Sequence, residues 1–179
     1  SFEPMVESLA VKAQELQQTS AAPKPEISGK YNSLAGSVKE YLRQQKSVMG
    51  HLQEFMDACA NLSSWLEQAQ EKLNKCAEPS GDRNELRSKH GTLKVLEAEQ
   101  AEGQKRLQLM LALAETARGF LEDEVEQQHV DQEAGHLVKA VEEFEERMAQ
   151  VKSALDVGLV KWDEYEEQFR RCQDWLNQH

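Results

Sequence analysis

Residues 27–76 read ISGKYNSLAGSVKEYLRQQKSVMGHLQEFMDACANLSSWLEQAQEKLNKC, and this stretch decides the fold. Its apolar residues recur at alternating steps of four and three, with one polar interruption at Gln45, so they line one side of a helix. At a rise of about 1.5 Å per residue, a helix without proline from Ile27 to Cys76 is about 75 Å long. Such a helix has to pass through more than one folded unit. The seam consists of Tyr31, Leu34, Val38, Tyr41, Val48, Leu52, Phe55, Cys59, Leu62, Leu66, Ala69, Leu73 and Cys76.

The same pattern returns further along the chain. A second seam runs from Leu137 to Leu176, and the pair Trp65-Leu66 aligns with Trp175-Leu176 at an offset of 110 residues, since 175 − 65 = 110. Other members of the two seams superimpose at this same offset. The sequence therefore contains an internal repeat.

A third apolar pattern lies between the two seams and supplies the partner that they need. Turn residues at 78–82 precede it, and the polar stretch 123–131 is predicted to end it. We therefore expect three helices near 52–75, 84–122 and 132–158, folded back on one another as a three-helix bundle. The third pattern has two rows, Leu86, Leu93, Gln100, Leu107, Ala114 and Leu121 in one and Leu96, Gly103, Met110 and Ala117 in the other.

These patterns predict an all-α chain of repeated bundles joined by continuous helices into an elongated rod. Residues 1–50 would be a partial repeat, with the end of a second helix at 2–16, a break at 21–25 and then a third helix. Residues 51–158 would be a complete repeat, and residues 159–179 would begin the first helix of the next. Helix is expected to continue through 42–56 and 152–166, with any bending near Gly50 and Gly158.

Composition excludes several classes of function. The formal net charge of −11 would repel nucleic-acid phosphates and anionic lipid surfaces, so we expect no nucleic acid and no direct membrane contact by this segment. The longest apolar run, from Leu109 to Ala114, is far shorter than the roughly 20 residues that cross a bilayer. Three widely spaced cysteines suit a reducing compartment, so a cytoplasmic protein is expected.

The sequence offers little for catalysis or metal binding. Two Glu-x-x-His pairs, Glu126/His129 and Glu133/His136, resemble the spacing in di-iron bundles, but such a site needs the pairs on different helices. Both fall in or beside one predicted loop, so we interpret them as polar surface. The three cysteines, Cys59, Cys76 and Cys172, lie on apolar seams at no zinc-binding spacing. No catalytic, cofactor or metal residue is therefore predicted, and the chain is not expected to be an enzyme.

Acidic residues gather in one region. Between Glu122 and Arg147 there are ten acidic residues against two basic ones. Such a run is either a solvated face or a docking patch for a positively charged partner, since clustered charge speeds encounter and restricts the choice of partner. The residues expected to bind a partner are Glu142, Glu143, Glu145 and Glu146.

Several of these residues resemble the spectrin repeat family. The likeness rests on Phe55, the triplet 64–66, Leu86, Lys89-His90, residues 93–97 and the recurrence of Asp174-Trp175-Leu176. In that family the tryptophan of the first helix anchors the core, and the lysine-histidine pair begins the second helix near it. The seams and the resemblance together imply a structural core that includes Trp65, Leu66, His90, Leu93, Phe144, Trp162 and Trp175.

The divergence and acidity are similar to those of giant cytoskeletal linkers such as nesprins, plakins or dystrophin relatives, and nesprins are the favoured resemblance. A nesprin-like chain would belong to a cytoplasmic tether that joins actin to the outer nuclear envelope through domains outside this segment. The leading hypothesis is thus a monomeric or weakly self-associating rod spacer and docking scaffold for cytoskeletal or cytoskeleton-regulating proteins. The alternatives are a self-associating coiled-coil filament protein, which the turn residues disfavour, and a helical-bundle enzyme that uses the Glu-x-x-His groups.

Overall fold

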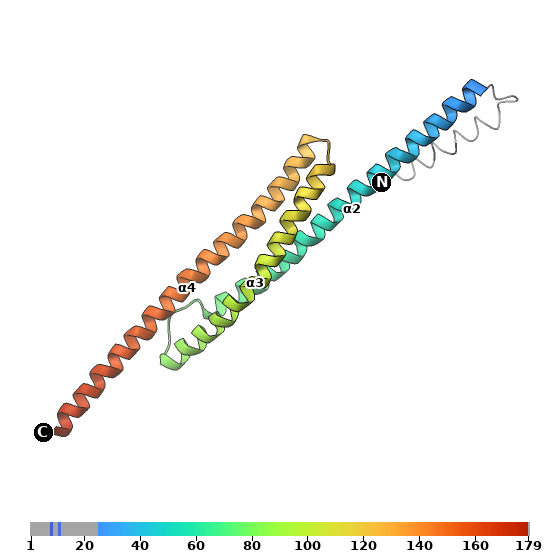
Figure 1. The fold of residues 1–179 in the computed structure, drawn as a ribbon. Helices are drawn as coiled ribbons and strands as arrows, with labels where there is room; N and C mark the ends of the chain where they lie inside the picture. The colour runs from blue at the N-terminus through green and yellow to red at the C-terminus, as the bar shows by residue number, and fades with distance from the viewer. Residues whose placement is uncertain (1–7, 9–10, 12–24, 179) are drawn as a thin grey trace. The chain divides into compact units, whose positions relative to one another are not determined.

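The computed structural model describes residues 8, 11 and 25–178, and this part of the chain is helical with short connections (Figure 1). Three long helices follow one another: α2 (Pro25–Cys76), α3 (Arg83–Phe120) and α4 (Glu124–Gln178). The expected helix at 2–16 lies outside the described residues, apart from two isolated positions. The chain divides into two compact units, Ser1–His51 and Leu52–His179.

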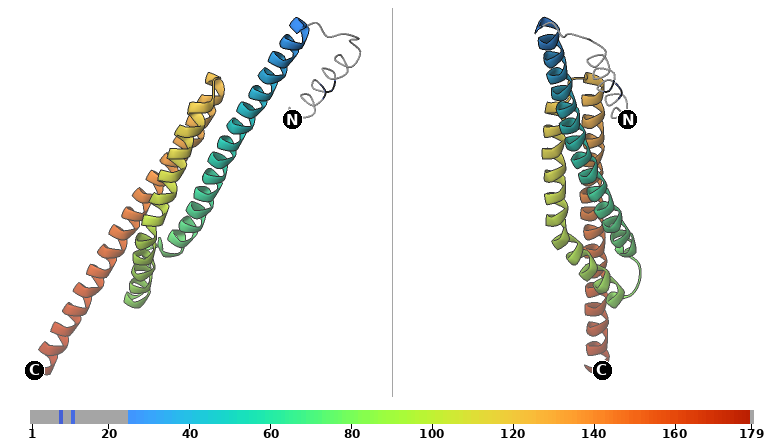
Figure 2. Two further views of the ribbon diagram at one scale, coloured as in Figure 1. Left: turned by 45° about the vertical axis from the view of Figure 1, so that its right-hand side comes forward. Right: turned by 90° about the vertical axis from the view of Figure 1, so that its right-hand side faces the viewer.

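The second unit contains a three-helix bundle of the kind that the seams predict. The end of α2, all of α3 and the first part of α4 lie side by side in both views of Figure 2. Their seams meet in a core without a buried polar or charged residue among the described side chains. The core holds Phe55, Ala58, Leu62, Leu66, Ala69, Leu73 and Cys76 from α2, Leu86, Leu93, Leu96, Leu107, Met110, Ala114 and Ala117 from α3, and Val130, Ala134, Val141, Phe144, Met148, Val151 and Leu155 from α4, with Leu121 from the connection between α3 and α4.

The start of α4 corrects the prediction that residues 123–131 form a break. The connection after α3 is only three residues long, and α4 begins at Glu124. Asp123 starts the helix, because its side chain accepts a hydrogen bond from the Val125 amide at 3.0 Å and its carbonyl accepts one from the Gln127 amide at 3.0 Å. Carboxylates in the first turn also favour the helix N-terminus. Polar composition was therefore a poor guide here, since glutamate and glutamine form exposed helix readily.

The turn between α2 and α3 follows the prediction. Asp82 caps α3, its carboxylate accepting a hydrogen bond from the Glu85 amide at 2.8 Å. Gly81 just before it adopts a φ of 112°, which a residue with a side chain seldom takes. The chain therefore reverses at this point, and α3 can pack back along α2.

Helix continuity through both predicted junctions is confirmed. α2 runs unbroken through 42–56, and α4 runs unbroken through 152–166. Within the first unit, the seam of α2 is not buried, and Leu34 and Tyr41 are about half exposed or more. The assignment of residues 1–50, 51–158 and 159–179 to successive repeats stays a prediction.

The two junction glycines differ in their surroundings. A methyl group added at Gly50 would meet nothing within 4 Å, as expected of an exposed helical position. A methyl group at Gly158 would lie 3.2 Å from Leu86 Cδ1. Gly158 is therefore a packing position that lets α4 approach the start of α3, and bending near it stays a prediction.

Candidate functional site

Trp65 is the aromatic anchor of the bundle, although its side chain stays partly exposed. Its ring stands edge-on to that of Phe144, with centroids 6.1 Å apart and an interplanar angle of 80°. The neighbouring Leu66 and Phe144 itself are buried. A Cβ atom built on Gly103 would lie under 3.0 Å from three carbons of the indole. Trp65 therefore packs between the α3 backbone at Gly103 and the ring of Phe144.

The Lys89-His90 pair makes its contacts near the start of α3, which corrects the prediction that it lies beside Trp65. Lys89 donates hydrogen bonds to the carbonyls of Glu78 and Ser80 at 2.8 and 2.9 Å and so braces the turn. His90 is half-buried and lies 3.0 Å from a carboxylate oxygen of Asp156 on α4. Gly103, which contacts Trp65, is thirteen residues further along α3, or about 20 Å of helix.

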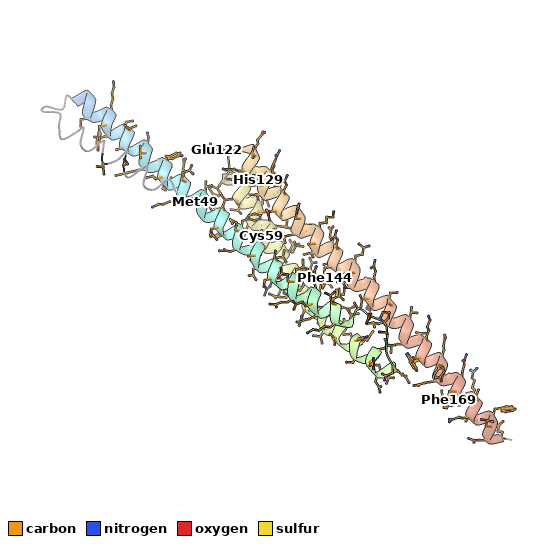
Figure 3. All side chains as sticks on the ribbon, turned by 180° about the vertical axis from the view of Figure 1, so that it is seen from behind. Met49, Cys59, Glu122, His129, Phe144 and Phe169 are labelled. Atoms are coloured by element: carbon orange, nitrogen blue, oxygen red, sulfur yellow. The ribbon has the colours of Figure 1, made fainter. Side chains whose placement is uncertain are left out.

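The remaining core predictions have mixed outcomes. Leu93 is buried between the helices. Trp162 is only partly covered and stands edge-on to Tyr165, with centroids 5.8 Å apart. The expected place of Trp175 in the core of a following repeat stays a prediction, and its side chain is 61% exposed here. The reason is geometric, because α4 extends past the ends of α2 and α3 in the second unit, and Phe169, labelled in Figure 3, lies on this extension.

One arginine ties the extension of α4 to the bundle. Arg83, at the first position of α3, pairs with Asp163 at 2.7 Å and also with Glu166. The hydrogen bond to Glu166 is the largest influence and raises the pKa of Arg83, with Asp163 adding to it. Two further contacts join the first turns of α3 to α4, the ion pair of His90 with Asp156 and the packing of Leu86 against Gly158. All three contacts lie on the same face of α3.

The four glutamates expected to bind a partner differ in exposure. Glu142, Glu143 and Glu146 are exposed, whereas Glu145 is half-buried and accepts a hydrogen bond from Gln104 of α3. Basic residues lie among them, since Glu142 shares a hollow with Arg118 and Lys139. The negative potential around these glutamates is therefore partly neutralised.

A groove of about 470 Å³ lies between α2 and the start of α4. Its walls are mostly apolar, and Figure 3 labels Cys59 on one wall and His129 on the other. Phe55 and Val130 close its floor, being 3% and 4% exposed. Met56 stands open on the rim at 60% exposed. The lining residues are Leu52, Phe55, Met56, Cys59, Glu126, His129, Val130 and Glu133.

The Glu-x-x-His pairs and the cysteines do not assemble into a metal centre. Both pairs lie on α4, not in a loop as predicted, and among the residues that the structure describes no three metal-binding side chains converge. Cys76 is buried, Cys172 exposed and Cys59 intermediate. Burial, and after it the charge of Glu133, raises the pKa of the Cys59 thiol. Within the same described part, no helix is long and apolar enough to span a bilayer.

Sequence reasoning placed Gly103 on an apolar row but missed its contact with Trp65, and it missed Met56 and Arg83 altogether. Gly103 interrupts a helical pattern, which often marks a close approach of another group to the backbone. Met56 is a large apolar residue that lies off the seam, a mark of an exposed contact surface. Nothing in the sequence singled out Arg83, because its partners lie about 80 residues away.

Comparison with known proteins finds a relative that aligns with nearly the whole chain. The chain is 37% identical over 177 residues, 99% of its length, to "Muscle-specific protein 300 kDa" of Drosophila melanogaster. It spans 1% of the length of that relative. No family model matches the chain. No solved structure matches it either.

Proposed function

Since the chain is a homologue of one segment of a nesprin-like giant protein and contains a spectrin-like three-helix bundle, we propose that it works as a rod spacer and docking scaffold within a cytoskeletal linker. The continuity of α2 and α4 through the ends of the bundle is the observation that supports this proposal most directly. A helix that leaves a bundle without a break transmits tension into whatever it joins.

The proposed mechanism is mechanical. Tension applied along α2 and α4 loads the bundle at opposite ends, because Leu52 lies beside the start of α4, whereas α4 leaves the bundle beyond the buried Leu155. The bundle resists until its apolar core separates, and it then unfolds as one unit. In a nesprin-like tether, this segment would lie in the cytoplasm between actin and the outer nuclear envelope, with both attachments made by other domains.

A single-molecule force measurement tests the spacer role. If residues 52–158 unfold together, about 107 residues extend at roughly 3.5 Å each, less about 57 Å for the folded bundle. The expected record is one cooperative step of about 300 Å. A smooth extension without a step would refute the proposal, because a chain that yields gradually cannot hold a load.

The docking role is proposed for the acidic surface of α4, toward a positively charged protein. Reversing the exposed glutamates of this surface together, Glu126, Glu133, Glu142 and Glu146, to lysine should weaken capture of such a partner from cytosolic extract, more at low salt than at physiological salt. Equal capture by the parent and the reversed chain would show that these glutamates are only a solvated surface.

Self-association as an open coiled coil is the competing function. The folded-back arrangement of α2, α3 and α4 disfavours it, because the seams of the bundle are already paired within one chain. Sedimentation equilibrium separates the two: the rod spacer predicts the monomer mass of 20.4 kDa at micromolar concentration. A stable dimer would favour the filament protein.

A further inference from the structure

The groove between α2 and α4 is a feature of the bundle surface and not a gap in the packing of its core. Its floor, Phe55 and Val130, is already shielded from water, so the bundle core is complete beneath it. The apolar surface left accessible comes from Leu52, Met56 and Cys59. Its volume of about 470 Å³ lies within the range of sites that hold a ligand or an inserted side chain.

The stretches of chain that form the groove contain acidic residues but no lysine or arginine. Neither residues 52–71 of α2 nor residues 122–138 of α4 contain a lysine or an arginine. Glu126 and Glu133 stand exposed at the rim. The acidic residues of the two stretches are Glu54, Asp57, Glu67 and Glu71 on α2, and Glu122, Asp123, Glu124, Glu126, Asp131 and Glu133 at and beyond the start of α4.

We infer that this groove is the docking seat for an amphipathic helix of a partner protein, with apolar side chains on one face and lysine or arginine beside them. The inference rests on the proposed scaffold role and names the site and the partner chemistry. The apolar walls would take the apolar face, and Glu126 and Glu133 would pair with the flanking basic residues.

A helix fits the groove better than an extended strand. The walls are helices whose backbone groups are bonded internally, so they offer no edge to which a strand could add. The span from Glu126 to Glu133 is about 10 Å of helix, which matches apolar side chains at positions i, i+4 and i+7 of a docked helix. Met56 suits such a surface, since methionine adapts to partners of different shape.

The groove is a better seat than the glutamates at 142–146. Of those four residues, Glu145 is bonded to Gln104, and Glu142 borders a hollow that also holds the basic side chains of Arg118 and Lys139. Lys139 and Arg147 also lie on either side of them in the sequence. The groove combines exposed apolar surface with the carboxylates of Glu126 and Glu133, whereas an acidic patch offers charge alone.

The test uses the whole 179-residue chain and a synthetic peptide of 14 residues made of leucine and lysine, with the leucines at helical spacing. Titration followed by amide chemical shifts should perturb residues 52–59 and 126–133, and binding should weaken as salt rises. A leucine–glutamate peptide of the same pattern should bind at least about tenfold more weakly. Shifts that map to another surface would overturn the inference.

A matched pair of variants tests the apolar contact. Met56→Asp should lower the affinity for the leucine–lysine peptide by about tenfold or more, because a charge then faces the apolar side of the peptide. Leu109→Asp, on α3 outside the groove and 55% exposed, should leave the affinity unchanged. Equal affinities for the two variants would overturn the inference. Circular dichroism checks that both variants keep the helix content of the parent.

Charge reversal gives a second, independent variant. Glu126→Lys with Glu133→Lys should lower the affinity for the leucine–lysine peptide at low salt by about threefold to tenfold. Glu142→Lys with Glu146→Lys should change that affinity little. If this second double variant lowers the affinity more than the first does, the inference is overturned and the 142–146 surface is the binding site. If decanoate binds the groove as tightly as the leucine–lysine peptide does, the inference is also overturned, because an apolar ligand without positive charge would then be sufficient for binding.

Self-association through the groove is the remaining rival. If Met56→Asp abolishes a dimer seen by sedimentation, the occupant is a second copy of the chain and the basic-helix inference fails. The force measurement on the bundle does not involve the groove, so the spacer role can fail or stand separately from this inference.

Discussion

The contact between Trp65 and Gly103 makes the sharpest prediction about the bundle. Gly103→Ala would place a methyl group under 3.0 Å from three carbons of the Trp65 ring, closer than real Cβ atoms come to other groups. The indole has to move, and its edge-on contact with Phe144 has to change with it. A substitution that normally stabilises a helix should therefore destabilise this one.

The magnitude follows from three contributions. Replacing a helical glycine by alanine gains about 1 kcal/mol. Overpacking costs about 1–3 kcal/mol, and loss of the aromatic pair costs about 0.5–1.5 kcal/mol. Gly103→Ala should therefore lower the free energy of unfolding by about 0.5–3.5 kcal/mol. Gly91→Ala is the matched control, because Gly91 lies on the same helix with nothing within 4 Å, and it should stabilise by about 0.5–1 kcal/mol.

Urea unfolding followed by circular dichroism measures both variants. The chain with Trp65→Ala provides the cross-check, since Gly103→Ala should no longer destabilise once the indole is gone. Trp65→Ala by itself should cost at most about 3–5 kcal/mol, because its ring is partly exposed. If Gly103→Ala stabilises the chain as much as Gly91→Ala does, the packing of Trp65 against α3 is wrong.

Three further predictions concern the junction and the thiols. Gly158→Ala should gain less stability in thermal melts than an open glycine would, because its methyl presses on Leu86; a full gain of about 1 kcal/mol would contradict the close approach. Arg83→Gln should speed hydrogen exchange in the adjoining α4 segment and remove the salt dependence of that exchange; unchanged rates would mean that the ion pairs do not hold the extension. Cys59 should react with iodoacetamide at pH 8 more slowly than the exposed Cys172, since a raised pKa leaves less thiolate; equal rates measured by mass spectrometry would contradict this.

The local spacing of apolar residues was sufficient to predict the architecture of this chain. Apolar residues at steps of three and four define a helix face over any length, so the seams of α2, α3 and the first part of α4 could be read without coordinates. The repeat offset and the turn at 78–82 then implied a chain folded back on itself. Leu66, Leu93 and Phe144 were placed correctly for the same reason, because they lie on seams that are covered on both sides.

The sequence alone determined which residues are helical and which face of each helix is apolar, since both depend on neighbours within a few residues along the chain. Tertiary structure decided whether a given seam position is covered, because covering needs two other helices at that height. In the part of the chain that the structure describes, Leu66 has them and is buried, whereas Trp175 lies on the extension of α4 and is exposed. Tertiary structure also decided the fit of Trp65 over Gly103 and the groove beside Met56. These features depend on where side chains far apart in sequence come to lie, and no local periodicity encodes that distance.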